Sequence, residues 1–140
     1  MYLVSLVYAS TKSPDWCDND IYEILTHAEA YNSQSDITGV LCFNGEIFLQ
    51  CLEGSRSVIN ALYRKIQNDK RHDNVMLLDY KEISERSFNE WNMLYIPVSN
   101  VDDVTTFRQP DNTAFDPFRM RGASALGLCR ELASVVPSHV

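Results

Sequence analysis

Residues 38–52 have the sequence Thr-Gly-Val-Leu-Cys-Phe-Asn-Gly-Glu-Ile-Phe-Leu-Gln-Cys-Leu. Two apolar runs flank the pair Asn44-Gly45, and an Asn-Gly pair in this setting is the strongest short-range signal for a β-hairpin, because both turn positions require a positive φ. The runs, over 38–43 and 46–52, are rich in the β-branched and aromatic residues that favour strands. The stretch therefore predicts two antiparallel strands joined by a tight turn.

Outward from the hairpin, helix and strand patterns alternate along the chain. Helical spacing of apolar residues predicts one helix over about 20–31 and another over about 56–68. Short apolar runs predict further strands, which cover 3–9, 75–81 and 91–96. The resulting order, β-α-β-β-α-β with one additional strand, is that of a ferredoxin-like sandwich of the α+β class.

Both faces of the predicted sheet need a cover, because the strands carry apolar residues on both sides. The two helices should cover one face. The natural cover for the other is an amphipathic C-terminal segment over about 119–136, and a second subunit is the alternative. We expect one domain over 1–97, followed by a C-terminal loop and helical cap over 98–140, with the polar stretch 99–117 as a linker or ordered loop.

The composition excludes several classes of function. The 140 residues carry a formal net charge of −7, which argues against nucleic acid as a partner, because phosphate backbones bind to basic surfaces. The four cysteines form no C-x-x-C pair, so we predict no metal site. No apolar stretch approaches the roughly 20 residues of a membrane span, and the first residues lack the features of a signal peptide. We expect a cytoplasmic protein without a membrane partner.

Gln50 is a polar residue on an otherwise apolar strand face, which it shares with Phe48 and Leu52. An unpaired amide there would cost about 1–3 kcal/mol, so it needs a hydrogen-bond partner. In the predicted order the first and third strands form the central pair, which can bring the phenol of Tyr8 to the Gln50 amide. From spacing alone, the two residues form either a satisfied pair in the core or part of a ligand site.

Four segments of the chain together match a known pattern. They are Tyr8 at the end of the first strand, Asn32-x4-Ile37-Thr38-Gly39-Val40-Leu41, Phe48-Leu49-Gln50-x-Leu52-Glu53-Gly54 and Arg86-x-Phe88-x2-Trp91-x-Met93. Over about residues 1–97 this pattern resembles the BLUF family of blue-light sensors, which use a flavin. The resemblance implies that 1–97 is a flavin-binding photosensor domain, with FAD as the expected cofactor and FMN as the alternative.

The resemblance also implies roles for individual residues. The flavin ring would lie between the two helices and above the sheet, where Tyr8 donates to Gln50 and the Gln50 amide contacts the ring. Asn32 would bind the O4/N3 edge of the ring, and Ile24 and Ile66 would hold its faces. The pyrimidine edge or the ribityl and phosphate part would be bound near the exit of the second helix by Lys65, Asp69, Arg71 and His72. Three of these four residues are basic, as a phosphate chain requires.

The predicted mechanism rearranges hydrogen bonds and transforms no substrate, so we expect no enzyme. Rotation or tautomerisation of the Gln50 amide would exchange donor for acceptor at the flavin, with Tyr8 as the electron and proton donor. Trp91 and Met93 alternate onto one face of the predicted last strand and would relay the change to the C-terminal segment. Output would pass to an unidentified protein partner or to a change in a homo-oligomer, with dimerisation through the uncovered sheet face as one route.

Two other functions compete with a photosensor. A catalytic flavoprotein is disfavoured, because the sequence shows no nucleophile–base pair or evident substrate pocket. A ferredoxin-like interaction module without a ligand would make the Tyr8–Gln50 pair a mere part of the core. The colour of the purified protein, and its response to blue light, would separate the three functions.

Overall fold

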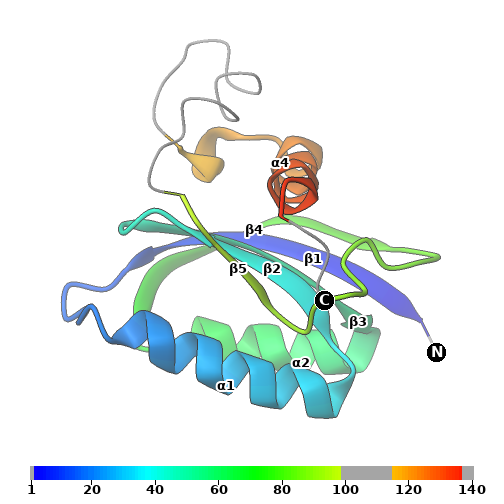
Figure 1. Ribbon diagram of the computed structural model, residues 1–140, viewed down its shortest axis with the longest axis horizontal. Helices are drawn as coiled ribbons and strands as arrows, with labels where there is room; N and C mark the ends of the chain where they lie inside the picture. Colours follow the sequence, from blue (N-terminus) through cyan, green and yellow to red (C-terminus); the bar gives the residue numbers. More distant parts are fainter. Residues whose placement is uncertain (1, 99–114, 137–140) are drawn as a thin grey trace.

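The computed structural model describes residues 2–98 and 115–136, which form a five-stranded sheet with helices on both faces (Figure 1). The elements in chain order are β1 (Leu3–Lys12), α1 (Asp20–Ser35), β2 (Thr38–Phe43), β3 (Ile47–Ser55), α2 (Arg56–Gln67), β4 (His72–Glu82), β5 (Leu94–Pro97), the 3-10 helix η1 (Pro117–Arg119) and α4 (Gly122–Ser134). The strand order is β4-β1-β3-β2-β5, antiparallel except for the parallel pair β2 and β5. The predicted ferredoxin-like order is confirmed, with β5 added beside β2.

The predicted hairpin forms between β2 and β3, but its turn differs from the expected one. Of the two residues Asn44 and Gly45, only Gly45 has a positive φ, of 95°. The Asn44 side chain closes the turn instead, because its Oδ1 accepts hydrogen bonds at 2.9 and 2.8 Å from the two backbone N–H groups that follow Gly45. Asparagine thus contributes its side chain to the turn and not a left-handed backbone.

Different parts of the chain cover the two faces of the sheet (Figure 1). The helices α1 and α2 lie together on one face and bury a cluster that includes Tyr8, Phe48 and Ile59. Helix α4 lies on the opposite face, where Leu128 and Cys129 join a second buried cluster. The expectation of a C-terminal cover is confirmed. The expectation of an uncovered sheet face is wrong, because α4 occupies that face; the oligomeric state stays a prediction.

Several element boundaries differ from the prediction, among them β1 and β4, which are longer than predicted. Two of the differences bear on the site. Helix α1 includes the polar residues after Asn32 and ends at Ser35, and its C-cap residue Asp36 has a left-handed backbone with a φ of 57°. Tertiary contacts outweigh local propensity here, since Asn32 is buried and bonded to another part of the chain. Strand β5 has only four residues and begins after Met93. Trp91 and Met93 therefore precede the strand in which they were predicted.

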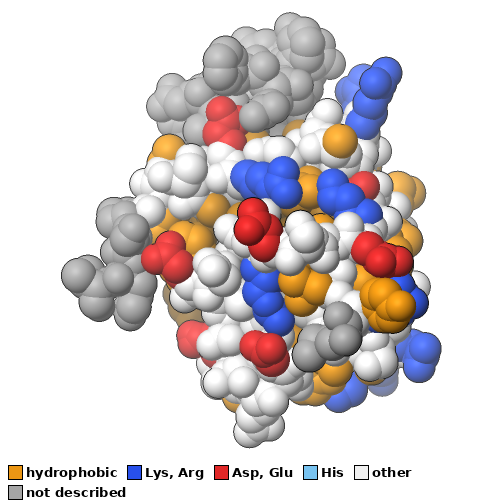
Figure 2. Space-filling view, turned by 90° about the vertical axis from the view of Figure 1, so that its right-hand side faces the viewer, with side chains coloured by type: hydrophobic (Ala, Val, Ile, Leu, Met, Phe, Trp, Pro, Cys, Tyr) orange, Lys and Arg blue, Asp and Glu red, His pale blue; other side chains and the backbone are white. Residues whose placement is uncertain are grey.

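The described residues show mixed surface charge and no membrane-spanning helix. Across residues 2–98 and 115–136, no helix has the length and apolar character needed to cross a membrane. Acidic and basic side chains are interspersed on the molecular face in Figure 2, in contrast to the basic patches that bind phosphate backbones. The polar stretch predicted as a linker covers 99–117, and its residues 99–114 lie outside the described residues.

Candidate functional site

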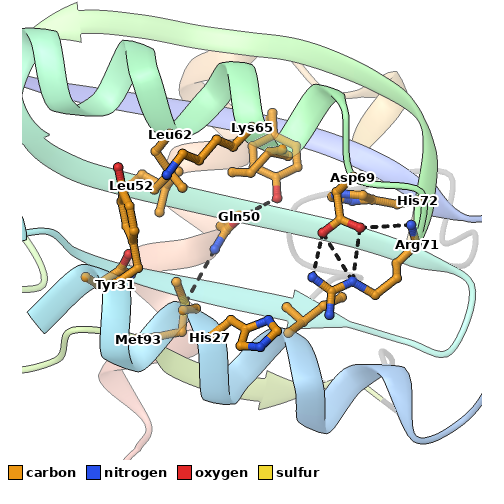
Figure 3. Close-up of a pocket in the computed structure, with 15 residues that line it drawn as sticks. His27, Tyr31, Gln50, Leu52, Leu62, Lys65, Asp69, Arg71, His72 and Met93 are labelled. Atoms are coloured by element: carbon orange, nitrogen blue, oxygen red, sulfur yellow. Dashed lines mark hydrogen bonds and ion pairs between the residues drawn. The ribbon is translucent and has the colours of Figure 1, made fainter.

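A cavity of about 210 Å³ lies between α1, α2 and the sheet (Figure 3). It is lined by all nine residues predicted to bind a cofactor, which are Tyr8, Ile24, Asn32, Gln50, Lys65, Ile66, Asp69, Arg71 and His72. Six further residues complete the lining, namely His27, Ala28, Tyr31, Leu52, Leu62 and Met93. The fold thus brings together residues that are spread from β1 to the segment just before β5.

Tyr8 and Gln50 meet on the sheet side of the cavity, on the central strands β1 and β3. They are opposite each other in the strand register, and the Tyr8 hydroxyl donates a hydrogen bond to Gln50 Oε1. Burial, with a smaller contribution from the charge of Asp69, raises the pKa of Tyr8 far above its ordinary value. The phenol therefore stays protonated and remains a hydrogen-bond donor.

The other end of the Gln50 amide has a weaker partner. Gln50 Nε2 donates to the sulfur of Met93 at 3.5 Å, as the dashed line in Figure 3 marks. A thioether is a weak acceptor compared with an oxygen. The amide is thus held firmly at its oxygen by Tyr8 and loosely at its nitrogen by Met93, so a stronger acceptor in the cavity could compete for the nitrogen.

Asn32 carries an unsatisfied acceptor in the wall of the cavity. The residue is only 1% exposed, and its Nδ2 donates to the backbone oxygen of Asn92 at 2.8 Å. Its Oδ1 is buried and has no hydrogen-bond partner. Such a group costs about 1–3 kcal/mol, which an N–H donor on a ligand would recover. A planar heterocycle with an N–H at its edge fits this requirement.

The two helices form the apolar walls of the cavity. Ile24 and Ala28 come from α1, and Leu62 and Ile66 come from α2. Walls of this kind pack well against the faces of a flat aromatic ring, while a few polar groups at the edge fix its orientation. The lining therefore combines apolar sides with polar contacts from Gln50 and Asn32.

Asp69 and Arg71 form an ion pair at one end of the cavity (Figure 3). Arg71 Nη2 lies 2.7 Å from Asp69 Oδ2, and Arg71 Nε donates to Asp69 Oδ1 at 3.0 Å. Burial tends to raise the pKa of the Asp69 carboxyl, but the hydrogen bonds and charge of Arg71 outweigh it and hold the pKa below its ordinary value. The positive charge of Arg71 is therefore largely compensated by the carboxylate of Asp69.

His72 does not supply the positive charge expected of it. Its ring is buried and its Nδ1 lies 2.9 Å from Ser10 Oγ. Burial lowers the pKa of His72 below its ordinary value, so the ring is neutral at neutral pH. The ring therefore adds no positive charge at this end of the cavity, and cofactor binding by His72 stays a prediction. The ring packs beside Tyr8 and Phe48, whose rings lie 6.3 and 5.4 Å away.

Lys65 and Tyr31 connect α2 to α1 beside the cavity. The Lys65 Nζ lies 4.3 Å from the centre of the Tyr31 ring, a cation–π contact, and both side chains are labelled in Figure 3. Tyr31 was not among the predicted binding residues. A usable signal existed, because His27, Ala28 and Tyr31 follow Ile24 at helical spacing and so share its face of α1.

Trp91 and Met93 lie on opposite sides of the sheet, so the prediction that they share one face is wrong. Met93 is buried in the cluster that contains Tyr8, whereas Trp91 packs against the cluster beneath α4. The alternation of a strand does not apply to them, because both residues precede β5. Of the two, Met93 lines the cavity.

A family model and two curated relatives match this chain. The family model described as "BLUF: Sensors of blue-light using FAD" matches residues 3–94. The chain is 41% identical over 80 residues to the blue light- and temperature-regulated antirepressor BluF of Escherichia coli (strain K12), and 36% identical over 86 residues to photoactivated adenylate cyclase subunit alpha of Euglena gracilis. These matches cover 56% and 61% of the chain, but only 20% and 8% of the two relatives.

One solved structure is similar to the chain over nearly its whole length. The photo-activated state of BlsA matches with a TM-score of 0.86 and 31% sequence identity, covering 99% of this chain and 99% of that one.

Proposed function

This chain belongs to the BLUF family, sensors of blue light that use FAD, and we propose that its cavity is the flavin site and that Tyr8 and Gln50 are the photoactive pair. The protein is a blue-light photoreceptor whose cofactor is a flavin. The observation that supports this assignment of the site is the Gln50 amide, which lies between the Tyr8 hydroxyl and the Met93 sulfur in the lining of the cavity.

The residues of the cavity fit a flavin. The buried, unpartnered Oδ1 of Asn32 would accept from an N–H at the edge of the ring. Ile24 and Ile66 would hold the two faces of the ring, and Gln50 would contact its edge. Lys65 would attract a phosphate, whereas Arg71 is paired with Asp69 and His72 is neutral. FAD is the expected form of the cofactor, and FMN is the alternative.

In this mechanism Tyr8 and Gln50 carry the change that follows absorption. When bound, the flavin supplies the absorption of blue light and an excited state that is a strong oxidant. Tyr8 is the oxidisable group of the hydrogen-bond chain, and its proton has an acceptor in place at Gln50 Oε1. Loss and return of an electron and this proton at Tyr8 would leave the Gln50 amide free to rotate or tautomerise, because its other end is held only by Met93.

The change at Gln50 alters what the amide presents to the cavity. In one state the Gln50 amide presents a hydrogen-bond donor to the cavity, and in the other state it presents an acceptor. Met93 responds, because it contacts the amide directly, and Trp91 then relays the change on the side of α4. The states need to differ by only about 1–3 kcal/mol for the pair to act as a switch.

The output is regulation without catalysis by this chain. The named relatives include an antirepressor and a cyclase subunit, of which the chain spans only a small part. By analogy, this photoreceptor acts in the cytoplasm on a protein partner that is not identified, or through a change in a homo-oligomer. Nucleic acid and membrane are not direct partners.

Absorption spectra of the purified protein test this function. A yellow protein whose flavin band shifts reversibly to longer wavelength under blue light supports a photoreceptor. A flavin that is bleached by a substrate in the dark would indicate a catalytic flavoprotein. A colourless protein that takes up no added FAD or FMN would indicate an interaction module without a ligand.

A further inference from the structure

The segment between β4 and β5, residues 83–93 and here called the connector, passes from one face of the sheet to the other. Phe88 is buried in the cluster beneath α4, whereas Met93 is buried in the cluster beside the cavity. Between them, the backbone oxygen of Trp91 accepts a hydrogen bond at 3.1 Å from the N–H of Gly39 in β2. A displacement of Met93 must therefore be absorbed within the connector or passed to its other end.

Glu53 holds that other end. Its side chain is only 1% exposed and points to the face opposite Gln50, because the two residues have opposite parity in β3. Glu53 Oε1 accepts hydrogen bonds at 3.0 Å from Thr38 Oγ1 and from the Phe88 backbone N–H, and Oε2 accepts one at 2.7 Å from the Ser87 N–H. One buried carboxyl group thus binds two successive amides of the connector.

Arg86 strengthens the same attachment. Its Nη1 donates to Thr38 Oγ1 at 3.0 Å and to the backbone oxygen of Glu53 at 3.2 Å, and its Nη2 donates to the backbone oxygen of Asp36 at 2.8 Å. The connector is therefore fixed to the start of β2 and the end of β3 by a network in which each member has a partner. Satisfied buried networks of this kind specify a single arrangement of the backbone.

The attachment also reaches α4. Arg130 Nε, on α4, donates to the Ser87 hydroxyl at 3.1 Å. Ser87 is thus bonded through its backbone to Glu53 and through its side chain to α4. The pocket and α4 are linked by one short segment that has a contact at each end.

We propose that Glu53 is a positioning residue for signal output: by fixing Ser87 and Phe88, it makes the connector deliver a movement of Met93 to α4. Without the hydrogen bonds from Ser87 and Phe88 to Glu53, the connector backbone would adjust to that movement and would not pass it to α4. The proposal rests on the proposed function above, because it concerns how the light signal leaves the flavin pocket. Coupling requires an element that both sites bias, and the connector contacts both Gln50 and α4.

The substitution Glu53→Gln tests the attachment while it preserves side-chain size. An amide has one oxygen and one NH2 group, so its NH2 must face an N–H donor of either Ser87 or Phe88. At least one of these backbone groups then loses its partner. Arg130→Met is the second variant, because it removes the donor of the contact with Ser87 and leaves Glu53 and its partners intact.

Ser5→Ala is a matched control. Ser5 lies opposite Glu53 in the strand register, is similarly buried, and has its hydroxyl 3.6 Å from Cys51 Sγ. It should lower the melting temperature without affecting the coupling.

The measurement is the light-minus-dark difference in amide hydrogen exchange of residues 122–134, recorded beside the flavin spectrum of the full chain. In Glu53→Gln and Arg130→Met we expect the red shift to persist, while the difference in exchange falls about threefold or more, the range expected for substitutions that affect coupling. Ser5→Ala should keep both signals.

A full exchange difference in either variant, or a red shift in the wild type without any response in α4, would overturn the proposal. Should Glu53→Gln not fold, Arg130→Met decides the matter alone. Absence of the red shift in the wild type would instead refute the proposed function.

Discussion

The two faces of the central sheet bury polar groups in different ways. On the side of α1 and α2, Tyr8, Gln50 and Asn32 surround a cavity of about 210 Å³, and Asn32 Oδ1 has no partner. On the side of α4, the buried carboxyl of Glu53 accepts three hydrogen bonds, and fully buried residues such as Leu128 form the core of that face. A buried polar group therefore indicates a ligand only where its bonding is incomplete and a cavity adjoins it.

A second buried oxygen without a hydrogen bond supports this distinction. Asp79 Oδ2, on β4, has no hydrogen-bond partner, but it lies 3.7 Å from Lys81 Nζ. An ion pair accounts for its charge, and Asp79 does not line the cavity between the helices. Incomplete bonding and a cavity coincide at Asn32, which is why the pocket face is assigned to the cofactor.

The largest expected effect is on the pocket face. Tyr8→Phe removes the hydroxyl that donates to Gln50 but keeps the ring, so the flavin should remain bound and the light-induced red shift should disappear. The matched control is Tyr63→Phe, because the Tyr63 ring lies 5.9 Å from the Tyr8 ring and is not part of the cavity lining. Difference spectra before and after blue light measure both variants. A normal photocycle in Tyr8→Phe would remove Tyr8 from the mechanism.

On the α4 face, the same kind of truncation should affect stability instead. Leu128 is fully buried, so Leu128→Ala should lower the free energy of unfolding by about 2–5 kcal/mol and leave the dark flavin spectrum unchanged. Leu62→Ala is the counterpart on the pocket face, since Leu62 lines the cavity. It should cost less stability and should alter flavin affinity. Denaturant titrations and flavin titrations of both variants test the contrast, which fails if Leu128→Ala changes the spectrum of the folded protein.

Asn32→Ala should weaken flavin binding about tenfold, because the bound cofactor loses a buried hydrogen bond worth roughly 1.4 kcal/mol. Asn60→Ala is the control, since Asn60 is exposed on α2 and bonds to Arg56 and Tyr80 away from the cavity. The dissociation constants of both variants for FAD give the comparison. Equal affinity of Asn32→Ala and wild type would mean that the unpartnered Oδ1 does not receive the cofactor.

The smallest effect concerns His72 and pH. Burial lowers its pKa in the folded state, so below the ordinary value of about 6.5 the unfolded chain takes up a proton that the folded chain does not. Stability should therefore fall as the pH drops from about 7 toward 5, with a slope from this residue of at most about 1.4 kcal/mol per pH unit. His72→Gln should flatten that part of the profile measured by urea unfolding. A profile as steep as that of the wild type would contradict the buried, neutral ring.

Local signals in the sequence identified much of this fold. The Asn44-Gly45 turn and the helical spacing of residues such as Ile24 fix the order of elements, and the apolar face around Gln50 indicates that its amide needs a partner. These are short-range patterns, and the contact between Tyr8 and Gln50 follows from the strand order that they predict.

The remaining features depend on tertiary contacts. The chain just before Trp91 and Met93 is held by hydrogen bonds that Glu53 accepts from the backbone N–H groups of Ser87 and Phe88, far away in the sequence. Periodicity does not register such contacts, and it placed Trp91 and Met93 wrongly on one face. Sequence shows that His72 is basic, but only its burial shows that it is neutral. Likewise, the pairing of Arg71 with Asp69 becomes evident only in the folded chain.

The most direct test of the central claim is the absorption of flavin-loaded Gln50→Leu under blue light. Leucine fills similar space but can neither accept from Tyr8 nor donate to Met93, so the two orientations of the amide no longer exist. We predict a protein that binds flavin and is excited by blue light, yet shows no reversible red shift. A persisting, reversible red shift in Gln50→Leu would contradict the assignment of this amide as the switch.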